Sequence, residues 1–310
     1  VIDLLGIFNI KRSINPDLKD LAGYILMFIA QDKDVGVEKK SEIFKGIKEE
    51  LANILNLDLS KRENREEFSN SFRGFISASI IEGLLKDEDF VGSISEGEKS
   101  YLKGLAQKII SQFNQLKEML SQEAGKEINA YGIAQGSSAY ISLLSRISRV
   151  FPEVNNAVIE GFKLSGTQKE IFEEYGILAL NGYEEFSQED YNSLKNVLSL
   201  LDQVFGGEKV RELINAIIRM PYDPSGVLGA AYPNGIIWLF GDLRNYPIPG
   251  GEGKTQNIFE IVLFHELAHH IDFSYEFLNQ AQHDYFNFLH FQSGYDLNNY
   301  ARLYGMVNKW

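Results

Sequence analysis

The chain has 310 residues, of which 44% are hydrophobic and 24% are charged, and it contains no cysteine. These values are typical of a folded globular protein, and they exclude disulfide-held scaffolds, cysteine zinc fingers, iron–sulfur clusters and thiolate nucleophiles. The net charge of −13 lies mainly in the second half: residues 1–165 carry 21 Lys and Arg against 24 Asp and Glu, whereas residues 166–310 carry 9 against 19. Because an acidic half repels phosphates, we expect no nucleic-acid partner.

The longest apolar stretch, Leu21 to Ala30, has ten residues, about half of the roughly 20 that a membrane-spanning helix needs. We therefore expect no transmembrane segment. The chain opens at Val1 without a Met or a basic and apolar leader, which indicates either a removed targeting segment or a boundary at this point. The compartment stays open, with a secreted or cell-surface location favoured, and the sequence does not reveal the oligomeric state.

Residues 1–165 are predicted to form an α-helical domain whose role the sequence leaves open. Ile, Leu, Phe and Ala recur there at three- and four-residue spacing, between polar stretches rich in Asp, Asn, Gly or Ser, which is the pattern of helices that bury one face. No repeat of roughly 20 to 50 residues is present, so a solenoid is not expected. The predicted helices are Ser41–Leu55, Asn64–Leu85, Glu98–Ala124 and Ser137–Val150.

In residues 166–310 short β-like segments alternate with helices, so the whole chain is predicted to be α+β and mostly helical, with a small mixed sheet in this second domain. Asn234 and Gly235 separate two runs of β-branched and aromatic residues, which is typical of a hairpin. The predicted elements are a strand at Tyr175–Leu180, helices at Ser187–Phe205 and Glu208–Arg219, the hairpin at Gly226–Phe240, and a helix from Gln256 to about Asp272.

The last of these helices contains the pattern His-Glu-x-x-His, from His265 to His269. Two His four residues apart lie on one face of a helix, so both imidazoles can bind one Zn²⁺. The Glu266 carboxylate can then take a proton from the zinc-activated water. Ile258, Ile261, Val262, Leu263 and Ala268 are expected to bury the helix and hold these side chains in place. The alternative without metal is a helix whose His residues only pack and hydrogen-bond. We expect His270 to lie at the surface or behind the metal ligands.

A catalytic zinc site needs a third protein ligand and an open position. The metzincin motif would require Gly and His at the positions of Asp272 and Tyr275, and the aspzincin motif Gly-Thr-x-Asp fails after Gly294. The remaining candidates within the chain have no recognised spacing; they are Asp272, Glu276, His283, Asp284, His290 and Asp296.

The segment His265–Asp272 resembles the zinc helix of gluzincins of the anthrax lethal factor and Pro-Pro endopeptidase group, which also carry Asp three residues after the second His. Lethal factor has Tyr-Gly-x-x-Asn-x-x-Glu downstream, and this chain has the matching residues from Tyr304 to Asn308 before it ends at Trp310. The resemblance covers about residues 176–310 and implies a zincin-like metallopeptidase domain. It also implies that the third zinc ligand is a Glu immediately after Trp310, so residues 1–310 alone are expected to bind zinc weakly and to have an incomplete catalytic site.

By the same resemblance, the Tyr304 hydroxyl would help to stabilise the oxyanion of the tetrahedral intermediate, although the residue could equally be one more core tyrosine. Asp272 would orient a zinc ligand from behind, or simply end the helix. Zincins hold the substrate backbone along an edge strand beside the zinc helix. Either Leu228–Tyr232 or Ile236–Phe240 could be that strand.

Another motif resembles a phosphate-binding loop, because Gly253-Lys254-Thr255 precedes the last helix. The P-loop pattern requires Gly where the chain has Ile248, so we do not expect a nucleotide cofactor. A loop over the active-site cleft is the preferred interpretation of residues 242–254.

The leading hypothesis is therefore a zinc-dependent endopeptidase, a hydrolase that cleaves a peptide or protein substrate with Zn²⁺ as its cofactor. His265 and His269 are its metal ligands, Glu266 its general base and Tyr304 its oxyanion-stabilising residue. The alternative is a catalytically inactive zincin-like protein that binds a partner or belongs to a toxin or surface assembly.

Overall fold

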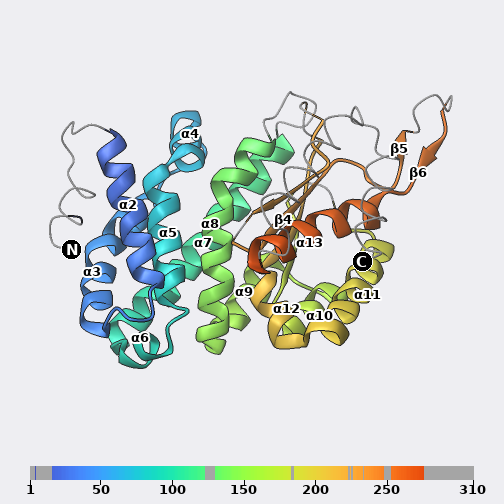
Figure 1. Cartoon of the computed structure of the whole chain (residues 1–310). Helices are drawn as coiled ribbons and strands as arrows, with labels where there is room; N and C mark the ends of the chain where they lie inside the picture. Colours follow the sequence, from blue (N-terminus) through green and yellow to red (C-terminus); the bar gives the residue numbers. More distant parts are fainter. Residues whose placement is uncertain are drawn as a thin grey trace.

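A computed structural model describes residues 4, 16–122, 130–182, 185–222, 224, 226–232, 234–247 and 253–275. The chain is α+β and mostly helical, with helices gathered at the N-terminal side and a small mixed sheet at the other (Figure 1). The helices of the first half are α2 Pro16–Gln31, α3 Val37–Ile54, α4 Arg62–Asn70, α5 Phe72–Leu84, α6 Glu88–Ser93, α7 Glu96–Gln122, α8 Ala130–Val150 and α9 Asn155–Phe162, with a 3-10 turn at Pro152–Val154. The second half contains α10 Gly166–Tyr175, β1 Leu178–Asn181, α11 Gln188–Phe205, α12 Gly207–Leu213, β2 Ala216–Met220, β3 Gly229–Tyr232, β4 Ile236–Phe240, β5 Tyr246–Pro247, β6 Thr255–Gln256 and α13 Phe259–Tyr275.

The helices predicted in the first half are present, with one break. The segment predicted as a single helix from Asn64 to Leu85 is divided at Ser71, whose hydroxyl accepts a hydrogen bond from the Gly74 N–H and caps α5. The apolar run Leu21–Ala30 lies within α2, which was not predicted. None of the helices in the described residues is long and apolar enough to cross a membrane.

The main sheet has the strand order β1-β2-β4-β3. Strands β1, β2 and β4 run parallel, and β3 pairs antiparallel with β4, so Asn234 and Gly235 form the predicted hairpin turn. The prediction of one helix over Glu208–Arg219 is wrong, because α12 ends at Leu213 and the following residues form the interior strand β2. All five β2 residues are buried, and a strand buried on both faces lacks the alternation that marks a half-exposed strand.

One face of this sheet packs against the helical half. Ile218, Trp238 and Phe240 belong to the same apolar core as residues of α3, α5, α7 and α8, and α8 contacts both β2 and β4. The opposite face, which includes Ile217 and Leu239, packs against α10–α13 in a second core. The predicted domain boundary at residue 165 lies between α9 and α10. The sheet belongs to the second half, but one of its faces packs with helices of the first half and the other face packs with α10–α13.

Candidate functional site

Helix α13 lies along the second face of the sheet with one side buried. Phe259, Leu263 and Leu267 are at most 3% exposed and pack into the second core. Ile261 and Phe264 point the other way and are 48% and 42% exposed, so the expectation that Ile261 is buried is wrong. The helix is therefore held by its apolar side, and the side chains between these two sides lie at the boundary with solvent.

The two His of the motif lie at that boundary, with their rings close together. The Nε2 atoms of His265 and His269 are 3.1 Å apart, and the ring planes are at 88° to each other. Two imidazole nitrogens bound to one tetrahedral zinc at about 2.0–2.1 Å would be roughly 3.3–3.4 Å apart. Both rings thus present Nε2 toward one point at a separation that fits a shared cation, and an N–H···N hydrogen bond has the same geometry.

Glu266 points from the same helix toward the sheet. It is only 5% exposed, and its Oε1 lies 4.0 Å from Nε2 of His265. Burial raises the pKa of Glu266 to about 8, and a hydrogen bond from the Ala231 N–H opposes this shift. A buried carboxyl with a raised pKa beside two possible metal ligands can hold or release a proton near neutral pH, as a general base requires.

The partner of Glu266 is the edge strand β3. Of the two candidate substrate strands, only β3 lies at the edge of the described sheet, because β4 is paired on both sides. The Phe240 N–H donates to the Leu228 carbonyl, and hydrogen-bonded residues alternate along an antiparallel ladder. The backbone N–H and C=O groups of Gly229 and Ala231 therefore face away from β4, toward Glu266 and the edge of β3 that no strand of the described residues covers.

The structure contains a buried ionic cluster beside the start of α13 that was not predicted from the sequence. Asp190, 1% exposed, accepts a hydrogen bond from Nε of Arg244 at 2.7 Å and lies 3.5 Å from Nη1 of Arg219. Both guanidinium groups lie about 6 Å from the ring of Phe259, at 6.0 and 5.8 Å. The cluster joins α11, β2 and the loop after β4 to the first residue of α13. The only sequence signal for it was the capping pair of Ser187 and Asp190.

His270 differs from expectation, because it is a core residue. It is 1% exposed, its Nε2 lies 3.3 Å from the Ile236 carbonyl oxygen, and burial lowers its pKa to about 4. In the neutral ring, Nε2 therefore carries the hydrogen, and the Nε2–H group donates a hydrogen bond to the Ile236 carbonyl oxygen. His270 fixes α13 to β4 instead of lying at the surface.

The remaining predicted residues lie outside the described part of the site. Asp272 is on α13, but its side chain is not described, and Tyr304 falls in residues 276–310, together with Glu276, His283, Asp284, His290 and Asp296. In the part of the chain that the structure describes, no third His, Asp or Glu joins His265 and His269 in a metal-binding group. The expected loop at residues 242–254 carries the short pair β5 and β6, with residues 248–252 not described.

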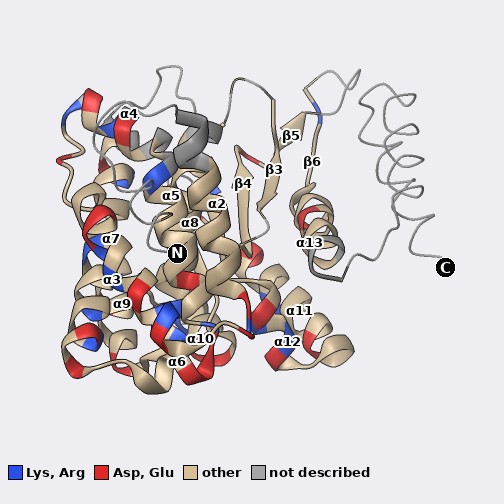
Figure 2. Cartoon of the chain, turned by 60° about the vertical axis from the view of Figure 1, so that its left-hand side comes forward, with Lys and Arg blue, Asp and Glu red and all other residues tan. Residues whose placement is uncertain are grey.

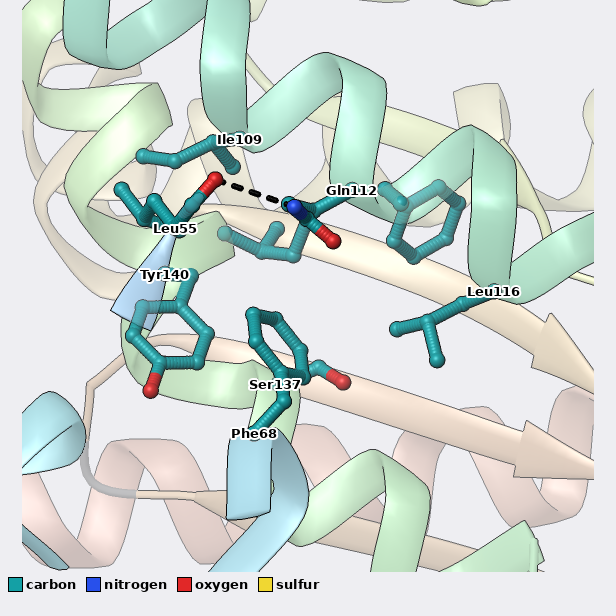
Figure 3. Close-up of a pocket in the computed structure, with 9 residues that line it drawn as sticks. Leu55, Phe68, Ile109, Gln112, Leu116, Ser137 and Tyr140 are labelled. Atoms are coloured by element: carbon teal, nitrogen blue, oxygen red, sulfur yellow. Dashed lines mark hydrogen bonds between the residues drawn. The ribbon is translucent and has the colours of Figure 1, made fainter. Parts of the chain in front are cut away.

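The cavity drawn in Figure 3 lies elsewhere, in the helical half. It is lined by the C-cap of α3 and by residues of α4, α7 and α8, and the amide of Gln112 donates to the Leu55 carbonyl at 2.9 Å across it. Its lining is mostly apolar and includes no acidic residue or His. Figure 2 shows that charged residues gather on the helices, while β3 and β4 are largely uncharged. The His265–His269 pair with Glu266 is thus the group that offers chemistry.

Comparison with protein-family models, with curated proteins and with solved structures finds no match to the chain.

Proposed function

We propose that the chain is a zinc-dependent endopeptidase of the gluzincin type, with a zincin-like domain in its second half. The observation that carries the proposal is the convergence of the His265 and His269 Nε2 atoms at 3.1 Å, with the Glu266 carboxyl buried beside them. Packing alone does not require two imidazole nitrogens to face one another next to a buried acid. Metal binding with an adjacent general base accounts for all three side chains.

In this mechanism His265 and His269 hold the metal through Nε2, which requires both rings to be neutral. Zinc supplies Lewis acidity, which activates water and polarises a carbonyl. Glu266 accepts the water proton on a carboxylate oxygen and returns it to the leaving amine nitrogen. A nearby dication favours the ionised carboxyl, which offsets the burial that raises the pKa of Glu266. The Ala231 N–H keeps this carboxyl at the open edge of β3.

The substrate is proposed to bind as an extended peptide along β3. Gly229 and Ala231 turn backbone N–H and C=O groups toward the open edge, where a peptide can add as a further strand. This contact pattern explains why a peptide, and not a small polar metabolite, is the proposed substrate class.

The test of the proposal uses the chain with one Glu appended after Trp310, loaded with zinc and incubated with a peptide library, with products identified by mass spectrometry. We expect cleavage that a chelator stops and added zinc restores. Glu266→Gln should lower the cleavage rate by about 10²–10⁴-fold, as loss of a general base does, while bound zinc measured by elemental analysis stays unchanged. His265→Ala should lose the zinc. Cleavage at the normal rate by Glu266→Gln would remove this residue from its role.

The third ligand is tested separately, by appending one Glu after Trp310. The proposal predicts that the added carboxylate raises zinc affinity at least tenfold over the same chain with an appended Gln. Equal affinities would place the third ligand among the candidates within residues 272–296. Zinc binding without any cleavage, by either version, would favour the alternative of a zincin-like binding protein.

A further inference from the structure

A residue without a side chain, Gly229, lies directly against Glu266. A Cβ atom placed on Gly229 would lie 2.4 Å from Oε1, 2.7 Å from Cγ and 2.8 Å from Cδ of Glu266, whereas ordinary contacts begin near 3.4 Å. The overlap involves the stem of the Glu266 side chain as well as its tip. Rotating the carboxylate alone therefore cannot relieve it, and the whole side chain would have to leave its position.

Backbone conformation does not explain why this position is Gly. Gly229 is the first residue of β3 and is not one of the glycines with positive φ, so any residue could adopt its backbone angles. Its neighbours along the strand are Ala230, Ala231 and Tyr232. What distinguishes Gly229 is that a Cβ at this position would overlap the Glu266 side chain.

We infer that Gly229 is a positioning residue, whose missing side chain creates the space in which the Glu266 carboxyl lies between β3 and His265. This inference rests on the proposed function for its catalytic consequence, although the contact itself does not depend on bound metal. Two groups define the position of the carboxyl: the Gly229 backbone limits its approach to β3, and the Ala231 N–H binds it. A methyl group at position 229 displaces Glu266 from both contacts.

The contact is tested first in the metal-free chain, by a double-mutant cycle of melting temperatures. Overpacking a buried site is destabilising, so Gly229→Ala should lower the melting temperature by about 2–5 °C. In the Glu266→Ala background the three closest contacts of the added methyl are removed, so the same substitution should cause a much smaller decrease. Gly104→Ala is the matched control, because a Cβ on Gly104 meets nothing within 4 Å. Equal decreases in both backgrounds would overturn the inference.

Kinetics of the zinc-loaded chain give the second readout. Displacing a catalytic group by about 1 Å can cost on the order of 10²-fold, so Gly229→Ala should lower kcat by about that factor, with KM and zinc affinity within about twofold of the unsubstituted chain. General damage to the fold would instead change zinc affinity and KM as well. An undiminished kcat in Gly229→Ala would overturn the positioning role. If the unsubstituted chain with one Glu appended after Trp310 cleaves nothing, the proposed function fails, and the melting-temperature cycle still decides whether Gly229 positions Glu266.

Discussion

The two faces of the sheet bury polar groups in different ways. On the face covered by α8, the Trp238 Nε1–H donates to Oγ of Ser138 at 2.8 Å, and the Asn215 amide donates to Oγ of Ser142 at 3.0 Å. These groups are neutral and satisfy one another. On the face covered by α13, the Glu266 carboxyl is buried beside His265, and burial raises its pKa to about 8.

The difference separates a face that buries neutral, mutually bonded polar groups from a face that buries a titratable carboxyl. Neutral buried groups with mutual hydrogen bonds add specificity to packing and have no reason to exchange protons. A carboxyl whose pKa is raised by burial destabilises the fold when it ionises. Such a group is retained in a stable fold more readily when it serves a reaction, and the comparison can be tested from both faces.

The largest expected effect comes from removing the central side chain of the α8 face. Trp238 is fully buried in the first core, and truncating a buried Trp costs about 3–5 kcal/mol. Trp238→Ala should therefore lower the free energy of unfolding by that amount in chemical denaturation. Leu200→Ala, which truncates a side chain that is 49% exposed, should change it by no more than about 0.5 kcal/mol.

The next effect is a gain in stability that depends on pH. Because the folded pKa of Glu266, about 8, lies above its ordinary value of 4.5, the folded state holds its proton more tightly, and stability falls as pH rises from 4.5 to 8. Glu266→Gln should stabilise the metal-free chain by on the order of a few kcal/mol at pH 9, and this gain should disappear near pH 4.5.

The measurement is thermal unfolding in chelator across this pH range. Glu260→Gln removes an exposed carboxylate from the same helix and is the matched control for the loss of one negative charge. A gain for Glu266→Gln that is the same at pH 4.5 and pH 9 would contradict the buried, protonated state.

The smallest expected effect is the loss of stability when the hydrogen bond between Trp238 and Ser138 on the α8 face is removed. Ser138→Ala leaves the buried Trp238 N–H without its acceptor, which costs about 1–3 kcal/mol. In a Trp238→Phe background there is no N–H to satisfy, so the same substitution should cost clearly less. Additive losses in denaturant titrations of the single and double variants would show that the hydrogen bond contributes little.

Helices and turns were predictable from the sequence where their signal lies in residues that are close together in the chain. The helix beginning near Ser187, the Asn234-Gly235 turn and the first-half helices apart from the break at Ser71 were confirmed, because each depends on residues close together in the chain. Strand β2 was assigned to a helix, since a short apolar run buried on both faces has no distinguishing period. The assignment of β3 to the edge could not be made in advance, because it depends on which strands pair.

At the candidate site, the residue types were predictable and their surroundings were not. The spacing of His265 and His269 on one helix predicts that their rings approach, and they do so at 3.1 Å. The burial of Glu266 against Gly229 and the hydrogen bond of His270 to Ile236 join segments more than 30 residues apart. No local pattern reports such contacts. The metal-binding and catalytic roles of these residues stay predictions.

The serine-lined surface of α8 has a practical consequence for dissecting the chain. Ser138, Ser142 and Ser145 let this helix lie close against the sheet, with Trp238 beneath it. Cutting the gene at residue 165 would expose the apolar residues of one whole sheet face, a surface prone to aggregation. A shortened version meant to keep the His265 site should therefore begin before Ala130, so that α8 remains as the cover of that face.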